Sequence, residues 1–95
     1  MGRTRNGSCA ELVTVPTTNV VAVRTSLDWA DLAAVPEVYA TAWSGLFGNL
    51  DLRPRETVLV RGATSSLGRA ALNLAVDHGA TVLATTRDAQ RAPLL

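Results

Sequence analysis

The sequence predicts an α/β protein, because strand patterns and helix patterns follow one another along its 95 residues. Val and Thr are frequent in residues 9–23, as in strands, and hydrophobic residues then recur at helical spacing in residues 27–47. The last part, residues 57–85, has two short apolar runs on either side of a helical pattern. This order predicts a β segment, connecting helices and a βαβ unit.

Composition excludes several classes of function. Hydrophobic residues make up 47% of the chain, but no apolar run approaches the roughly 20 residues that a membrane span requires. The start, "MGRTRNGSCAE", lacks the apolar region of a signal peptide, so we expect a cytoplasmic protein without a membrane partner. A net charge of +1 is too small for a nucleic-acid surface, so no nucleic-acid partner is expected. With only Cys9 and His78 as strong ligands, the chain cannot supply a four-ligand zinc site.

The first elements are expected in "CAELVTVPTTNVVAV", where Pro16 interrupts a Val- and Thr-rich stretch. This pattern predicts two short strands around a turn at residues 17–19. Helices follow. Asp28 lies where an N-cap is expected, Pro36 should end or kink the first helix, and a second helix should run to Phe47 with Gly48 as its stop.

In the second predicted helix, hydrophobic residues fall on two neighbouring faces. One face carries Val38, Ala42 and Leu46, and the other carries an aromatic set that we interpret as core packing: Tyr39, Trp43 and Phe47. The polar run in residues 53–56 then indicates a boundary, and we place a domain junction near Asn49.

The stretch "VLVRGATSSLGRAALNLAVDHGATVLATTR", residues 58–87, carries the strongest pattern. Four consecutive strand-favouring residues predict a first strand over 57–61 that is covered on both faces, as in a parallel sheet. A helix with a narrow alanine face follows from about Ser66, His78 and Gly79 should end it, and residues 81–85 form the second strand. The result is a βαβ unit.

The small-residue turn between the first strand and this helix is a candidate phosphate site. A helix start leaves backbone N–H groups unpaired and carries a partial positive charge, and small residues let an anion approach both. Glycines stand at Gly62 and Gly68 with Ser65 midway, so two of the three positions of a G-x-x-G-x-x-G turn match. Many such turns only connect a strand to a helix, and that alternative stays open on the turn alone.

Three segments together resemble a known family: "GSCAELVTVP", "LDWADLAAVPEVYATAW" and the stretch over residues 58–87. In this order they resemble the zinc-independent medium-chain dehydrogenase/reductases, specifically the NADPH:quinone oxidoreductase group. The resemblance implies that residues 1–49 are the C-terminal part of a GroES-like catalytic domain with its linker helices. Residues 50–95 would be the start of a Rossmann NAD(P)-binding domain. Both domains would be incomplete, since a full dinucleotide-binding sheet needs two βαβαβ halves.

The same resemblance implies which residues meet the cofactor, expected to be NADPH. The amides of Ser66 and Leu67 would meet the pyrophosphate, and Thr41 would lie beside the nicotinamide. Ser65 departs from the usual glycine, so its side chain must lie aside or donate its hydroxyl to the phosphate. Thr86, Arg87 and Arg91 match the stretch that meets the adenosine ribose in that family. The residues implied in cofactor binding are Thr41, Gly62, Ser65, Ser66, Leu67, Gly68, Thr86, Arg87 and Arg91.

The end of the second strand bears on cofactor choice. An acidic residue there binds the ribose 2′-OH of NAD, while a cation suits the 2′-phosphate of NADPH. The sequence has Arg87 at this position with Arg91 nearby, and we expect the Asp88 carboxylate between them to face outward. These residues favour NADPH.

The implied function is hydride transfer from NADPH to a small quinone or enone-type substrate, and the resemblance is compatible with a homodimer. No catalytic residue can be carried over, and we expect the 95-residue chain alone to be inactive. Two alternatives remain. The chain could be a non-catalytic truncated remnant or interaction module, or a short-chain reductase-like segment, whose T-G-x-x-x-G-x-G turn is partly met by "RGATSSLG". In that second family the turn normally opens the chain, whereas residues 1–56 precede the strand here.

Overall fold

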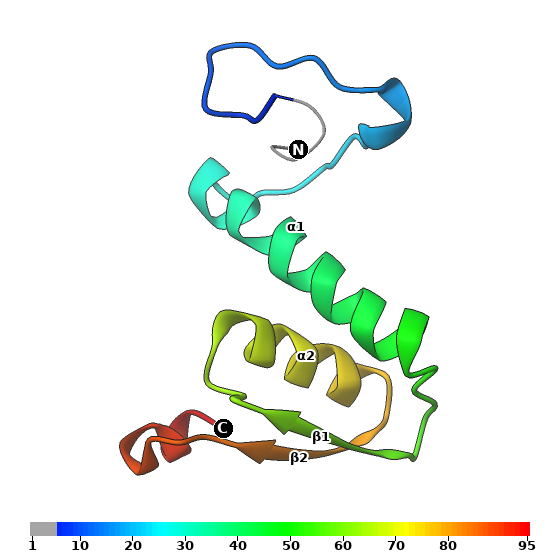
Figure 1. The fold of residues 1–95 in the computed structure, drawn as a ribbon, viewed down its shortest axis with the longest axis vertical. Helices are drawn as coiled ribbons and strands as arrows, with labels where there is room; N and C mark the ends of the chain where they lie inside the picture. The colour runs from blue at the N-terminus through cyan, green and yellow to red at the C-terminus, as the bar shows by residue number, and fades with distance from the viewer. Residues whose placement is uncertain (1–5) are drawn as a thin grey trace.

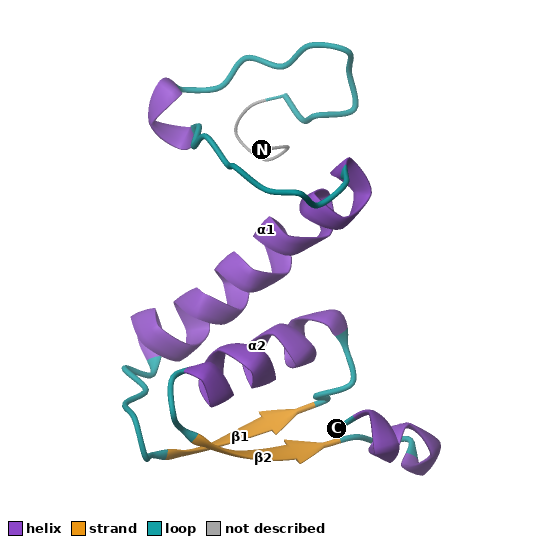
Figure 2. Cartoon of the chain, turned by 180° about the vertical axis from the view of Figure 1, so that it is seen from behind, coloured by secondary structure: helices purple, strands orange, loops and turns teal. Residues whose placement is uncertain are grey.

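The computed structural model of the chain describes residues 6–95. An irregular N-terminal segment leads into a long helix and then into a βαβ unit, and Figures 1 and 2 show the second helix lying between the first helix and a two-stranded sheet. The principal elements are α1 (Trp29–Trp43), η2 (Ser44–Asn49), β1 (Thr57–Arg61), α2 (Ser66–Asp77) and β2 (Thr81–Thr85). The predicted α/β class is confirmed.

The predicted βαβ unit is confirmed with the expected strand bounds. The strands β1 and β2 pair in parallel, with Thr57 opposite Thr81. Val58 and Val60 are buried beneath α2, but Leu59 on the opposite face is 57% exposed. The prediction that β1 is covered on both faces is therefore wrong for the described part of the chain, because no element of residues 6–95 lies over the second face. Leu83 of β2 is left equally bare on that face.

Helix α2 packs closely on the sheet because its inner face consists of small side chains. Ala70 and Ala75 are almost completely buried. The helix ends as predicted, with His78 as its C-cap and Gly79 at a φ of 82°, a left-handed conformation that glycine adopts without a Cβ clash. The amide of Gly79 donates to the carbonyl of Val76 at 2.9 Å.

Helix α1 begins where the sequence predicts. The Asp28 carboxylate accepts a hydrogen bond from the amide of Asp31 at 2.8 Å, which caps the helix. The expected interruption into two helices is wrong, because α1 continues through Pro36 as a single helix. An interior proline costs about 3 kcal/mol. Contacts of the C-terminal half of α1 with α2 offset this loss, including the hydrogen bond from Asn73 to the Tyr39 hydroxyl at 3.0 Å.

The end of this helical region also differs from the prediction. Gly48 does not stop the helix, because the chain continues through it in the π-helical turn η2. The reversal occurs at Asp51, whose φ of 50° is left-handed, a conformation that aspartate tolerates better than most residues. The amide of Leu52 then donates to the carbonyl of Leu46 at 3.0 Å, and both leucine side chains are buried. The burial of these two leucines fixes the end of the helix, and the conformational freedom of Gly48 is not used for it.

The hydrophobic core lies where η2, α2 and β1 meet. It is built from Leu46, Leu52, Val58 and Ala75, with Phe47 packed against it. The face predicted from fourfold spacing is confirmed, since Ala42 and Leu46 are buried and Val38 is half-buried.

The aromatic face is only partly a core face. Phe47 packs against the core and, edge to face, against the ring of His78, with ring centroids 4.8 Å apart. Tyr39 is half-buried, but Trp43 is 57% exposed, so the core interpretation is wrong for Trp43. The domain junction predicted near Asn49 stays a prediction.

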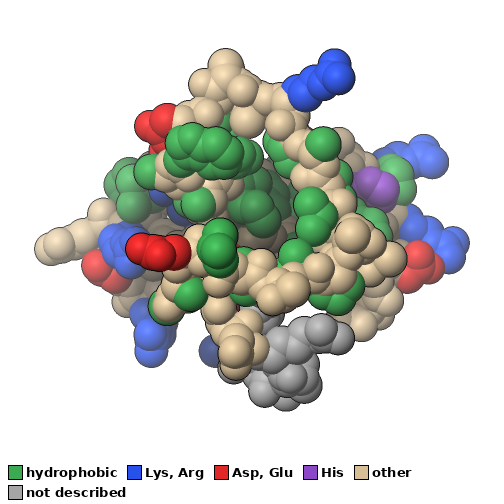
Figure 3. All heavy atoms as spheres, turned by 90° about the horizontal axis from the view of Figure 1, so that it is seen from above, with side chains coloured by type: hydrophobic (Ala, Val, Ile, Leu, Met, Phe, Trp, Pro, Cys, Tyr) green, Lys and Arg blue, Asp and Glu red, His purple; other side chains and the backbone are tan. Residues whose placement is uncertain are grey.

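The N-terminal segment has the predicted turn but not the predicted strands. Residues 17–19 form a short 3₁₀ turn, η1 (Thr17–Asn19), in which the Asn19 amide donates to the Pro16 carbonyl at 2.9 Å. No strand pairing occurs in residues 6–28. Strand formation needs a hydrogen-bonded neighbour, and no other described segment supplies one. Leu12 is consequently 90% exposed, and Figure 3 shows hydrophobic side chains at the surface of this end of the molecule.

None of the helices described over residues 6–95 combines the length and apolar character needed to cross a lipid bilayer.

We predict that the isolated 95-residue chain is only marginally stable. Half of the eight buried hydrophobic residues among residues 6–95 are alanines, which bury little area, and Leu59, Leu83 and Val21 lie in water. A thermal midpoint below about 65 °C, the upper end of the range for ordinary mesophile domains, is therefore expected in circular-dichroism melting. A sharp, reversible transition of the monomer above that temperature would contradict the prediction.

Candidate functional site

The candidate site is the turn that joins β1 to α2. Gly62 begins it at a φ of 66°, which is left-handed and suits glycine. The amide of Ser65 donates back to the Gly62 carbonyl at 3.0 Å, and the amide of Ala63 donates to the carbonyl of Thr85 at 2.9 Å. The turn is thus closed on itself and tied to the end of β2.

Ser65 has a structural role in this turn. Its hydroxyl accepts a hydrogen bond from the Gly68 amide at 3.1 Å and donates one to the Gly62 carbonyl at 2.9 Å. Ser65 is therefore the N-cap of α2, and its side chain lies aside within the turn. Of the two conformations expected for a serine at this position, the structure has the first.

Two amides at the start of α2 remain available to a ligand. The first amides of a helix have no intrahelical partner, and here Ser65 satisfies those of Gly68 and Arg69. Within residues 6–95 the amides of Ser66 and Leu67 donate no hydrogen bond. These are the two amides that the sequence analysis assigned to the pyrophosphate, and the helix dipole makes the same end favourable for an anion.

Gly68 lets the helix approach the turn. A Cβ at this position would lie 2.5 Å from the Gly62 carbonyl oxygen and 2.7 Å from the Ala63 Cα. Both are backbone atoms that cannot rotate away, so only glycine permits this spacing. Gly68 thereby holds the first turn of α2 against the strand end.

A cleft beside the turn is lined by the three residues that were predicted to meet the adenosine ribose, Thr86, Arg87 and Arg91. It has a volume of about 200 Å³, and its lining residues come from the turn and from the segment after β2: Gly62, Thr64, Ser65, Thr86, Arg87, Asp88 and Arg91. Arg87 and Arg91, four residues apart in sequence, both line it. In the described part of the chain neither arginine forms an ion pair with a carboxylate.

The Asp88 carboxylate caps a short 3₁₀ helix, η3 (Ala89–Leu94), by accepting a hydrogen bond from the Gln90 amide at 3.0 Å. Asp88 still lines the cleft, so it contributes negative charge beside the two arginines. Its hydrogen bond to Gln90 holds that carboxylate at the start of η3.

Thr64 plays a part in the site that was not predicted from the sequence. This residue is the buried polar residue of the described core, at 8% exposure. Its hydroxyl lies 3.4 Å from the Thr86 hydroxyl, and its carbonyl accepts a hydrogen bond from Arg91 Nη2 at 3.0 Å. The sequence signal for this role is a threonine within a turn of small residues. Its partners, Thr86 and Arg91, are 22 and 27 residues away, so the sequence alone does not pair them with Thr64.

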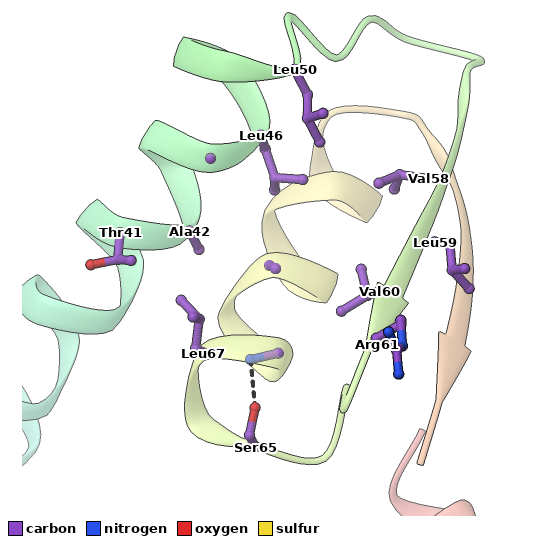
Figure 4. A pocket seen from close by; sticks show the side chains of 13 residues that line it. Thr41, Ala42, Leu46, Leu50, Val58, Leu59, Val60, Arg61, Ser65 and Leu67 are labelled. Atoms are coloured by element: carbon purple, nitrogen blue, oxygen red, sulfur yellow. Dashed lines mark hydrogen bonds between the residues drawn. The ribbon is translucent and has the colours of Figure 1, made fainter. Parts of the chain in front are cut away.

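Thr41 lies in a second, mostly apolar hollow of about 510 Å³ between α1, α2 and β1. Figure 4 shows Thr41, Ala42 and Leu46 on one side of it and Ser65 and Leu67 near its lower end. The Thr41 hydroxyl donates to the Glu37 carbonyl of its own helix at 2.9 Å.

Ser65 lines both hollows, so the turn separates the adenosine-side cleft from the hollow that contains Thr41. Ser66 lines neither hollow, and its amide is one of the two without a hydrogen-bond acceptor within residues 6–95.

Comparisons with known proteins identify similar segments. No protein-family model matches the chain. The chain is 42% identical over 95 residues to part of a highly reducing polyketide synthase of Aspergillus carbonarius, an alignment that covers 96% of this chain and 4% of that protein. The chain spans about 3–4% of the length of the curated relatives that it matches.

Two solved structures are similar over most of the chain. The CurK enoyl reductase matches with a TM-score of 0.79 and 28% identity, covering 86% of this chain and 24% of that one. The quinone oxidoreductase of Thermus thermophilus, also solved in complex with NADPH, matches with a TM-score of 0.78 and 33% identity. That match covers 90% of this chain and 28% of the oxidoreductase chain.

We predict that Gly68→Ala destabilises the chain by about 1–3 kcal/mol, because the added methyl group meets backbone atoms of the turn and forces α2 away. Urea unfolding measures the change. Gly45→Ala is the matched control, since a Cβ at Gly45 meets nothing within 4 Å, and it should cause no loss. Equal stability of the two variants would show that α2 does not depend on this close approach.

Proposed function

Because the chain has the fold seen in quinone oxidoreductases and enoyl reductases of the medium-chain dehydrogenase/reductases, as its sequence predicted, we propose that it is part of an NADPH-dependent reductase. In this proposal the βαβ unit binds the cofactor, and the whole protein transfers hydride from NADPH to a quinone or enone-type substrate. The observation that carries the proposal is the cleft in which Arg87 and Arg91 flank the glycine turn.

The turn suits the pyrophosphate of a dinucleotide. The amides of Ser66 and Leu67 are free, and the first turn of α2 places its positive dipole end behind them. Ser65 keeps its hydroxyl within the turn, so it limits neither the approach of the phosphate nor the two amides. The adenosine end would then occupy the cleft at the end of β2.

Cofactor choice follows from the charges in this cleft. Arg87 offers a guanidinium group, which can hydrogen-bond phosphate oxygens in a planar, bidentate manner, and Arg91 adds a second positive charge nearby. The 2′-phosphate of NADPH is the part of the cofactor that NADH lacks. Asp88 opposes this preference by one charge, but its carboxylate is engaged as the cap of η3. Two cations against one capped carboxylate favour NADPH.

The nicotinamide end would lie on the other side of Ser65. Thr41, Leu67 and the aliphatic residues around them form an apolar hollow, which excludes water from a bound ring. Thr41 would contact the ring from α1. When bound, NADPH supplies the hydride, and the residues of this chain hold and orient it.

The substrate class is inferred from the relatives. The similar structures include enoyl reductases and a quinone oxidoreductase, and the similar sequences include polyketide synthases. Enoyl groups and quinones both contain a carbon–carbon double bond conjugated to a carbonyl, so each accepts a hydride and then a proton. We therefore propose a conjugated carbonyl compound as the substrate.

We predict that Arg87→Ala, made in the whole protein, weakens NADPH binding about tenfold to somewhat over a hundredfold and leaves NADH binding nearly unchanged. The lost interaction is a hydrogen bond to a charged group, which contributes roughly 1.5–3 kcal/mol. Calorimetric or fluorescence titration with each cofactor measures the two affinities.

The control for this experiment is Arg24→Ala, which removes the same charge from an exposed site in the N-terminal segment. It should change neither affinity. If Arg87→Ala lowers both affinities equally, or if the unmodified protein already binds NADH better, the assignment of Arg87 to the 2′-phosphate is wrong.

We also predict that the 95-residue chain alone does not oxidise NADPH with an added quinone. Residues 6–95 form a two-stranded sheet rather than the two βαβαβ halves of a complete dinucleotide fold, and they provide no assigned proton donor. Absorbance at 340 nm follows the reaction. Steady, quinone-dependent loss of NADPH by the purified chain would refute the prediction.

A further inference from the structure

We propose that Arg91 is a positioning residue for the phosphate turn and supports the binding of NADPH and NADH alike, whereas Arg87 distinguishes the two cofactors. The inference rests on the proposed function, since it assigns separate tasks to two arginines of the same cleft. Its observation is the hydrogen bond from Arg91 Nη2 to the Thr64 carbonyl, at 3.0 Å.

Three contacts join the turn to the segment that follows β2. The Ala63 amide donates to the carbonyl of Thr85, the hydroxyls of Thr64 and Thr86 lie 3.4 Å apart, and Arg91 donates to Thr64. The first is an ordinary backbone bond and the second is long. Only the third has a charged donor, and charge-assisted hydrogen bonds are roughly twice as strong as neutral ones.

The Thr64 carbonyl belongs to the same rigid peptide unit as the amide of Ser65. That amide donates to Gly62, and the Ser65 side chain caps α2, so the orientation of this peptide unit sets the start of the helix. A guanidinium that holds the carbonyl oxygen therefore also holds the direction of the free amides of Ser66 and Leu67.

The same contact removes an electrostatic obstacle. A backbone carbonyl oxygen carries partial negative charge, and in a turn that receives phosphate an unpaired oxygen would repel the ligand. Pairing the Thr64 oxygen with Arg91 offsets that charge. This benefit concerns any dinucleotide, because both cofactors carry the pyrophosphate.

The short helix η3 places Arg91 for this contact. Asp88 caps η3 through the Gln90 amide, and the Arg91 amide donates to the Asp88 carbonyl at 3.1 Å. This tight turn brings the Arg91 side chain back toward the glycine turn while the Asp88 carboxylate is engaged elsewhere. Within residues 6–95 the Arg87 side chain forms no hydrogen bond with the turn, so it stays available to a 2′-phosphate.

The experiment compares Arg91→Ala, Arg91→Lys and Arg87→Ala in the whole protein. Titration with NADPH and with NADH gives the two affinities. Hydrogen exchange of the hydrogen-bonded amides of Ser65, Gly68 and Arg69, measured without nucleotide, reports the order of the turn. Arg91→Met, which keeps the aliphatic part of the side chain, replaces the alanine variant if that variant does not fold.

We expect Arg91→Ala to weaken NADH binding about tenfold, to weaken NADPH binding at least as much, and to speed exchange at the amides of Ser65, Gly68 and Arg69. Arg91→Lys, which can still donate to the carbonyl, should restore most of the NADH affinity. Arg87→Ala should leave both NADH binding and exchange unchanged.

Unchanged NADH affinity and unchanged exchange in Arg91→Ala would overturn the inference while leaving the proposed function intact. Failure of the unmodified protein to bind either cofactor would instead refute the proposed function. The exchange measurement needs no nucleotide, so in that case it still decides whether Arg91 positions the turn.

Discussion

The close approach of α2 to the end of β1 is the constraint on which the rest of the site depends. It requires a residue without a Cβ at Gly68, because the turn backbone lies within 2.5–2.7 Å of where that atom would be. Ala70 and Ala75 continue the same close contact along the helix. With the helix at this distance Ser65 caps it while bonding to Gly62, and two free amides at the helix start lie at the turn.

Electrostatics adds selectivity to that backbone geometry. The helix dipole and the free amides favour any anion, and they are the same for both nicotinamide cofactors. In the proposed function, Arg87 adds charge at the end of β2, where the two cofactors differ. Exposed charges interact weakly through water, so the influence of this charge would grow when a bound ribose displaced solvent from the small cleft. On this proposal the backbone geometry provides the affinity for either cofactor, and the charge of Arg87 provides the discrimination.

The sequence predicted the βαβ unit well because its signals are local. The run of strand-favouring residues in β1 and the capping pattern of His78 and Gly79 specify the strand and the end of the helix without help from distant residues. Predictions failed where a distant partner decides. The valine-rich strands of the N-terminal segment lack a neighbour to pair with, α1 passes through Pro36 because it packs on α2, and Asp51 rather than Gly48 reverses the chain.

The same distinction applies to the site. The spacing of Gly62, Ser65 and Gly68 was enough to predict that they form one turn. Five of the predicted cofactor-binding residues line one cleft: Gly62, Ser65, Thr86, Arg87 and Arg91. The bond between Arg91 and Thr64 spans 27 residues and has no counterpart in local sequence, so only the structure reveals it. Arg91 matched the ribose-contacting stretch in the sequence, yet its described contact is with the protein backbone.

The bare face of the sheet lies away from the cleft beside the glycine turn. Leu59 and Leu83 are exposed on the sheet face opposite α2, whereas the turn lies beyond the carboxyl ends of the parallel strands, the usual place for a ligand in such sheets. An element that covers this face would stabilise β1 and β2 and contact Leu59 and Leu83, which do not line the cleft of Arg87 and Arg91. Because the Ala63 amide is bonded to the end of β2, firmer strands would also hold the turn more firmly. An element packed on the bare face of the sheet would therefore also stabilise the proposed anion site, because β2 is hydrogen-bonded to the turn.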